Sequence, residues 1–233
     1  MMRRLRYLVY PFSLLLLISV PVFSGETTLA VLDFENNSFF NPEVYHPLSK
    51  GLAEMMITEM NQVQSIRVVE RRKLRSLFDE LKLSQSGVIT EESSVQVGKM
   101  LGVQHLVFGG YMVTLGEKIR IDVRVVEVET GLTIKAGEVT GKTKQVLSLL
   151  KRLSKKILKD LHIRMTKKEA RSFEKSQKLD MKAVVLFSEG LEFEDRDQWA
   201  KAKECYQRAL QMEPQFQQAR MRIQKLVERE KSL

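Results

Sequence analysis

Two carboxylates near the start of the chain are the first residues that could do chemistry together. Asp33 and Glu35 follow an apolar run, and the alternation of a β-strand would place both side chains on one face. Such a pair can supply a general acid and a general base. No nucleophile, metal-ligand cluster or phosphate-binding loop accompanies it in the sequence. We therefore expect Asp33 to pair with a basic residue or to cap a loop.

The other reactive residue types are scattered. His46, His105 and His162 lie far apart, so no two of them share a helical turn as metal-binding motifs require. The single cysteine, Cys205, excludes an internal disulfide and a cysteine-based zinc site, and we expect it to fill space in a helix. The sequence therefore predicts a protein that is not an enzyme and holds no cofactor and no metal.

The N-terminus has the order of segments that is typical of export. The chain has 233 residues and a net charge of +9, and residues 1–6 hold three arginines and no acid. Residues 8–23 are almost wholly apolar, and Gly25 follows. This order predicts a signal peptide over residues 1–24, with an uncleaved membrane anchor as the alternative. The expected location is the periplasm, either free or in association with the outer membrane, and nucleic acid is not an expected partner.

Residues 26–163 predict one α/β domain with a mixed sheet, a three-stranded antiparallel meander and packed helices. Ile119, Ile121, Val123 and Val125 alternate with charged residues, which is typical of a half-buried strand. Gly109-Gly110 suggests a kink or bulge. The expected strands are 28–34, 66–69, 105–114, 118–127 and 132–140, and the expected helices are 48–63, 74–81, 90–101 and 143–162.

Four motifs within residues 28–163 occur in the order seen in the CsgG family. They are Leu29-Ala30-Val31-Leu32-Asp33-Phe34, Val69-Glu70-Arg71, Val97 to Val103 leading to Val107-Phe108-Gly109-Gly110, and Arg124 to Gly131. The chain resembles this family, which includes the curli production assembly/transport component and shares its fold with LpoB and the N-terminal domain of TolB. The resemblance implies an envelope protein that assembles through protein contacts and often self-associates.

The chain departs from the pore-forming member of that family. Residues 114–117 make a brief turn between the first two meander strands, and residues 141–142 lead the third strand directly into its helix. Neither place has room for a membrane-spanning hairpin of about 9–11 residues per strand. We therefore expect a periplasmic assembly or secretion accessory. The alternatives are a subunit of a curli-type secretion channel and an LpoB-like activator of a cell-wall enzyme.

Exposed aromatic residues are expected in the loop after the first strand. Phe39, Phe40 and Tyr45 stand among turn formers, and loop aromatics often mark a contact surface. The resemblance adds Asn41, because the matching loop of the curli channel narrows its pore with aromatic and asparagine side chains. The alternative is that Phe39 or Phe40 packs under the edge of the sheet.

A basic stretch follows the domain. Residues 142–182 contain 14 Lys and Arg against four acids, and we expect residues 164–182 to form a basic helical linker. The stretch is either a solvated helix face or a contact with anionic lipid or an acidic partner. The residues proposed for such a contact are Lys151, Arg152, Lys155, Lys156 and Lys159.

Residues 183–230 resemble one tetratricopeptide repeat with a capping helix. Small residues would let two helices approach, large ones would fill the gap, and a single repeat would need support from the α/β domain, a partner or another copy. A plain helical hairpin is the alternative. The residues that match the repeat are Leu186, Gly190, Phe193, Trp199, Ala202, Tyr206, Ala209 and Pro214.

Overall fold

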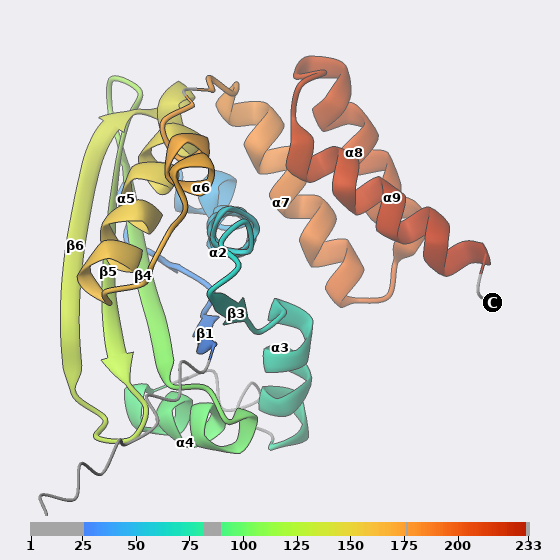
Figure 1. Cartoon of the computed structure of the whole chain (residues 1–233). Coiled ribbons are helices and arrows are strands. Elements are labelled where there is room, and N and C mark those ends of the chain that lie inside the picture. The colour runs from blue at the N-terminus through green and yellow to red at the C-terminus, as the bar shows by residue number, and fades with distance from the viewer. Residues whose placement is uncertain (1–25, 82–89, 176, 232–233) are drawn as a thin grey trace, which may run out of the picture.

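The computed structural model describes residues 26–81, 90–175 and 177–231 and has the expected mixed α/β architecture (Figure 1). Its sheet has the strand order β3-β1-β4-β5-β6, and β2 pairs separately with β4. The strands are β1 (Thr27–Val31), β2 (Glu35–Asn36), β3 (Ile66–Val68), β4 (His105–Thr114), β5 (Lys118–Glu127) and β6 (Thr133–Lys142). The helices are α1 (Pro42–Tyr45), α2 (Leu48–Met60), α3 (Arg71–Glu80), α4 (Glu91–Leu101), η1 (Thr143–Gln145), α5 (Val146–Asp160), α6 (Lys167–Ser172), α7 (Met181–Asp195), α8 (Trp199–Met212) and α9 (Gln217–Lys231).

The two faces of the sheet are covered unequally. The first face packs on α2 and α5, and α7 lies behind α2, so this side holds the larger core (Figure 1). The second face is covered by α3 and α4 only beside β1 and the start of β4, where a smaller core forms around Leu74, Phe78 and Leu106. The rest of the second face, over the meander, carries the charged residues of β5.

The meander follows the predicted alternation. Ile119, Ile121, Val123 and Val125 are all buried in the larger core. The pair Gly109-Gly110 is not a bulge, because β4 and β5 stay in register through it. A register shift occurs where β5 pairs with β6, between Val125 and Val126 of β5. The glycine makes room for a neighbour instead: a Cβ at Gly109 would lie 2.3 Å from the ring of Phe34.

Local signals fix the ends of α4. The hydroxyl of Thr90 accepts a hydrogen bond from the backbone N–H of Ser93 at 3.2 Å, as an N-cap does. Gly102 ends the helix in the left-handed conformation, with φ of 65°. Of the linker predicted over residues 164–182, Lys167–Ser172 form a helix, α6, which begins with a capping box between Thr166 and Glu169.

Two expectations concern membranes. The predicted signal peptide, residues 1–24, lies outside the described residues. Among the residues that the structure describes, no helix combines the length and the apolar character that crossing a bilayer requires.

The C-terminal helices share the core of the α/β domain. Phe187 of α7, Tyr206 of α8 and Phe216 are fully buried in the same apolar cluster as the strands and α2. Helices α2 and α7 approach closely at Gly51, where a Cβ would lie 1.8 Å from Oγ of Ser188. The support that a single repeat would need is therefore provided by α2.

Candidate functional site

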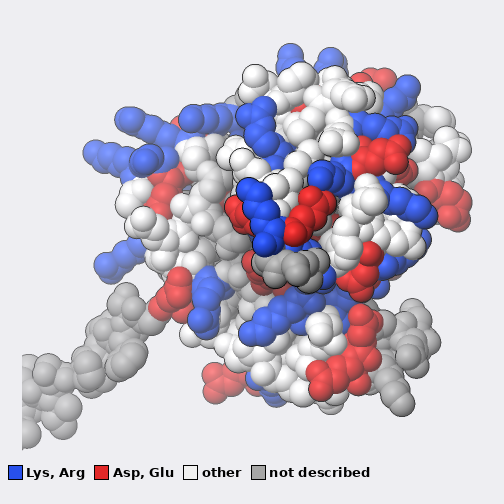
Figure 2. Space-filling model, turned by 90° about the vertical axis from the view of Figure 1, so that its right-hand side faces the viewer, with Lys and Arg blue, Asp and Glu red and all other residues white. Residues whose placement is uncertain are grey.

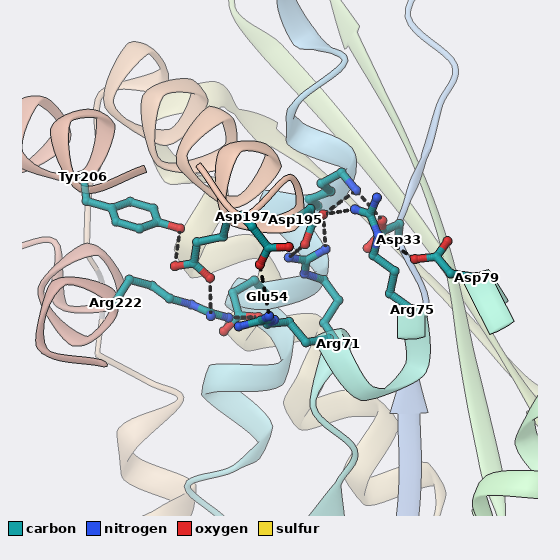
Figure 3. A network of polar contacts seen from close by, with 12 residues as sticks. Asp33, Glu54, Arg71, Arg75, Asp79, Asp195, Asp197, Tyr206 and Arg222 are labelled. Atoms are coloured by element: carbon teal, nitrogen blue, oxygen red, sulfur yellow. Dashed lines mark hydrogen bonds and ion pairs between the residues drawn. The ribbon is translucent and has the colours of Figure 1, made fainter. Parts of the chain in front are cut away.

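A buried carboxylate at the end of α7 gathers three cations from the α/β domain (Figure 3). Asp195 accepts two hydrogen bonds of 2.8 Å from the guanidinium of Arg71 and one of 2.8 Å from the ammonium of Lys50. Arg75 forms a further ion pair with it. The side chains of Asp195 and Arg71 are each only 2% exposed. Burial alone would raise the pKa of Asp195, but hydrogen bonds and charge from Arg71 and Lys50 outweigh it and hold the pKa well below its ordinary range.

The residue before it makes a second cluster. Glu194 is buried and accepts hydrogen bonds from the hydroxyl of Tyr206 at 2.8 Å and from Arg222 at 3.0 Å. Arg222 also pairs with Glu54 of α2. Burial, reinforced by the negative charge of Glu194, raises the pKa of Tyr206, so the phenol remains a donor. The two clusters join α7 to α8, α9, α2 and α3.

A cavity of about 760 Å³ opens beside the Asp195 cluster, between α3 and the second face of the sheet. Nε of Arg71 is buried and has no hydrogen-bond partner among the described residues. The cavity is lined by apolar side chains, which include Leu32, Leu74, Phe78 and Phe108, and by charged side chains of both signs. The charged residues that line it are Asp33, Glu35, Lys50, Arg71, Arg75, Asp79, Asp122 and Arg124.

Both carboxylates singled out in the sequence, Asp33 and Glu35, line the cavity. Asp33 lies 3.4 Å from Nζ of Lys50, so the expected pairing with a basic residue is confirmed. Glu35 begins β2 and also lines the cavity. Within the described part of the chain, no group of three or more His, Cys, Asp or Glu side chains could hold a metal ion.

A family model matches the N-terminal part of the chain. Residues 13–118 match the family model described as Curli production assembly/transport component CsgG. The resemblance to the CsgG family is confirmed for this part of the chain, which contains β1 to β4 and the loop after β1. No curated protein matches the chain.

Several solved structures resemble parts of this chain. The C-terminal domain of LpoB from Escherichia coli has 17% identity, covers 54% of this chain and 89% of its own, and gives a TM-score of 0.36. A PelC dodecamer from Paraburkholderia phytofirmans has 11% identity and covers 59% and 89%, with a TM-score of 0.36. Lipoprotein GNA1162 from Neisseria meningitidis has 12% identity and covers 60% and 99%, with a TM-score of 0.39.

The loop within the CsgG-matched segment projects two aromatic side chains. Phe39 is 84% exposed and Phe40 is 51% exposed, so neither packs under the sheet edge. Asn41 precedes α1 in the left-handed conformation, with φ of 46°. Tyr45 turns the other way and packs on the core, where its carbonyl accepts a hydrogen bond of 2.7 Å from the hydroxyl of Tyr111.

The predicted anionic-contact residues do not all lie on the surface. Lys151 is buried, with its ammonium 3.8 Å from Glu59, so its assignment to a surface contact is wrong. The reason is that the face of α5 that carries Lys151 packs against α2, which carries Glu59. Burial raises the pKa of Glu59, and the positive charge of Lys151 opposes that rise. Lys155 pairs with Glu174 and Lys156 with Asp160.

Arg152 and Lys159 are exposed on the same helix, α5. On the side of the molecule drawn in Figure 2, cationic side chains project together from the upper left. Over the centre of that side the two charges are interspersed. Some lysines of α5 are therefore neutralised by nearby carboxylates while Arg152 and Lys159 are exposed, so this surface is not one uninterrupted basic face.

Several of the repeat-matching residues lie where α7 packs on α8. A Cβ at Gly190 would lie 2.3 Å from the ring of Tyr206, so the glycine lets α7 and α8 approach. Ala202 and Ala209 are fully buried, Leu186 and Phe193 pack at the edge of the core, and Pro214 is exposed. The guanidinium groups of Arg72 and Arg229 stack on the ring of Trp199, at 5.0 Å and 4.0 Å from its centroid. The assignment as a tetratricopeptide repeat stays a prediction.

Sequence reasoning missed the charged clusters. Arg71 and Asp195 are 124 positions apart, and Lys50 and Asp195 are 145 apart, so no local spacing links them. A signal was available in α2, where the charged residues Lys50, Glu54 and Glu59 lie on a helix whose apolar residues are almost all buried. A charge on such a helix needs a partner from another element.

Proposed function

We propose that this chain is a non-enzymatic envelope protein of the CsgG type, located in the periplasm, that serves as an assembly or secretion accessory through protein contacts. The observation that carries the proposal is the match of residues 13–118 to the CsgG family model. The α/β domain would dock on the envelope machine or on further copies of itself, and the C-terminal helices would recruit another protein.

The attachment of the helices supports this division of work. The ion pairs of Asp195 and the shared apolar core hold α7–α9 against α2 and α3. A partner bound to the helices would therefore keep a fixed position relative to whatever the α/β domain contacts. Met212 of α8 and Met221 of α9 are 42% and 38% exposed, and methionine suits adaptable protein contacts.

Site-specific photocrosslinking in intact cells tests the proposal. Benzoylphenylalanine at Met212 should give an adduct with a defined envelope protein, identified by mass spectrometry. The control position is Thr140, exposed on β6 at the other side of the molecule. An adduct with a fibre subunit would favour the secretion role, and one with a peptidoglycan synthase would favour the activator alternative. Equal labelling from both positions, or none, would contradict recruitment by the helices.

A further inference from the structure

Four of the most exposed apolar side chains lie at one end of the molecule. They belong to the loop at residues 37–45 and to the turn between β4 and β5. Phe39 is 84% exposed, Phe40 51%, Val44 56% and Leu115 71%. Large apolar side chains gathered at one place mark an interaction site, whereas scattered ones need no explanation.

Hydrogen bonds place the loop beside the turn. The hydroxyl of Ser38 accepts from the backbone N–H of Val113 at 3.0 Å, and Val113 stands two residues before Leu115. The N–H of Asn37 donates to the carbonyl of Tyr111 at 2.8 Å. The turn lies at the upper end of the sheet in Figure 1, opposite the β5–β6 turn and α4.

Hydrogen bonds within the loop hold the segments on both sides of Phe39 and Phe40. The side-chain oxygen of Asn36 accepts from the N–H of Ser38 at 3.0 Å, and its amide donates to the carbonyl of Pro42 at 2.9 Å. The N–H of Val44 donates to the carbonyl of Asn41 at 3.0 Å. These hydrogen bonds use polar groups on both sides of Phe39 and Phe40, so those groups do not have to find new partners when the loop contacts a surface.

Lysines flank the apolar tip. Lys118 and Lys142 are directly opposite each other on β5 and β6, and both side chains are exposed. Like charges at opposed positions destabilise a sheet, and an anionic surface would relieve the repulsion. Lys144 is close by, because the N–H of Thr143 donates to the carbonyl of Glu117 at 2.8 Å.

We propose that this end of the molecule inserts its apolar tips into an anionic lipid surface, with the lysines at the level of the phosphates. The four exposed apolar side chains come from two separate segments, and a fluid headgroup layer can close around each of them. Glu43 and Glu117 are exposed at the same end and must stay in water, which limits the insertion to side-chain depth. This inference is independent of the partner proposed for α7–α9.

Two leucines in turns at opposite ends of the sheet provide a matched test. Leu115→Cys and Leu132→Cys in the full chain carry an environment-sensitive nitrobenzoxadiazole label, at sites that are 71% and 66% exposed. Cys205 is 6% exposed and stays in place. With vesicles of phosphatidylethanolamine and phosphatidylglycerol at 3:1, the label at 115 should shift to the blue and the label at 132 should not.

Variants then separate the contributions. Phe39→Ser with Phe40→Ser should lower the vesicle affinity of the 115-labelled chain at least tenfold, because the apolar area is lost. Lys118→Gln with Lys142→Gln should lower it about fivefold for each lysine at low salt and should flatten the salt dependence.

Three results would overturn the proposal. A shift at 132 but not at 115 would mean that another part of the chain, such as apolar residues 8–23, holds the vesicle. No shift at either position would exclude lipid contact. A shift at 115 that needs an added envelope protein would make the tip a protein-binding surface.

Discussion

Removing the charge of Asp195 while keeping its shape should destabilise the fold strongly. In Asp195→Asn, Arg71 remains buried, with its side chain 2% exposed, and loses the carboxylate that neutralises it. Lys50 and Arg75 are 18% and 37% exposed, so they recover part of their hydration. Breaking a buried pair from one side costs about 3–5 kcal/mol. The amide still accepts a hydrogen bond, so we expect about 3 kcal/mol, which is roughly 6–12 °C in Tm for a chain of this size.

The control for this experiment stands two residues away. Asp197 is 73% exposed, lies 3.9 Å from Arg72 and has a φ of 55°, which asparagine tolerates. Asp197→Asn should therefore change the free energy of unfolding by less than about 0.5 kcal/mol. Urea unfolding followed by circular dichroism measures both variants. A loss below about 1 kcal/mol in Asp195→Asn, or equal losses in the two, would refute the reasoning.

The same carboxylate predicts a dependence on pH. The pKa of Asp195 in the folded chain lies below its ordinary value of 3.8, so its contribution is complete above that pH and is lost as the pH falls. The wild type should therefore lose unfolding free energy on acidification below about pH 4 more steeply than Asp195→Asn does. Parallel curves for the two proteins would show that another group sets the acid limit.

Three further substitutions should shift the urea midpoint without changing the m-value. Gly51→Ala forces a methyl group against Ser188, and it should cost about 1–3 kcal/mol by separating α2 from α7. Gly190→Ala would press a methyl group against the buried ring of Tyr206, so it should lower the urea midpoint. An unchanged or higher midpoint would contradict the close packing of α7 on α8. Thr90→Ala removes the N-cap of α4 and should cost about 1 kcal/mol, with Thr90→Ser as the variant that retains stability.

The elements that sequence predicted well are those whose signals are local. The strand expected over residues 118–127 is β5, because alternation of apolar and charged residues specifies a face without reference to the rest of the chain. Thr90 and Gly102 mark the ends of α4 because capping involves only neighbouring residues. The turn at residues 115–117 is as brief as the sequence indicated.

The first strand shows where local signals fail. It was expected over residues 28–34, but β1 ends at Val31 and residues 35–36 pair separately with β4 as β2. The break lets Phe34 place its ring over Gly109, a contact between residues 75 positions apart. Apolar periodicity identifies Phe34 as buried, but it cannot indicate that the chain must bend to bury it.

The Asp195 cluster of the candidate site could not be predicted either, because Arg71 and Lys50 are 124 and 145 positions away from Asp195 in the sequence. Both charged clusters are built around one turn of α7. Successive residues of an α-helix point about 100° apart. Glu194 and Asp195 are neighbours at the end of α7, so one carboxylate faces Tyr206 and Arg222 while the other faces Arg71 and Lys50.

One turn of α7 therefore fixes the helices to one another and to the α/β domain at once. A buried ion pair is a poor source of net stability, but a misplaced helix would leave several charges buried without partners. The double variant Arg71→Met with Asp195→Leu separates these effects. It should recover most of the stability that Asp195→Asn loses, because no buried charge is left unpaired. Failure to recover it would mean that the cluster stabilises the fold through its charges rather than by excluding wrong arrangements.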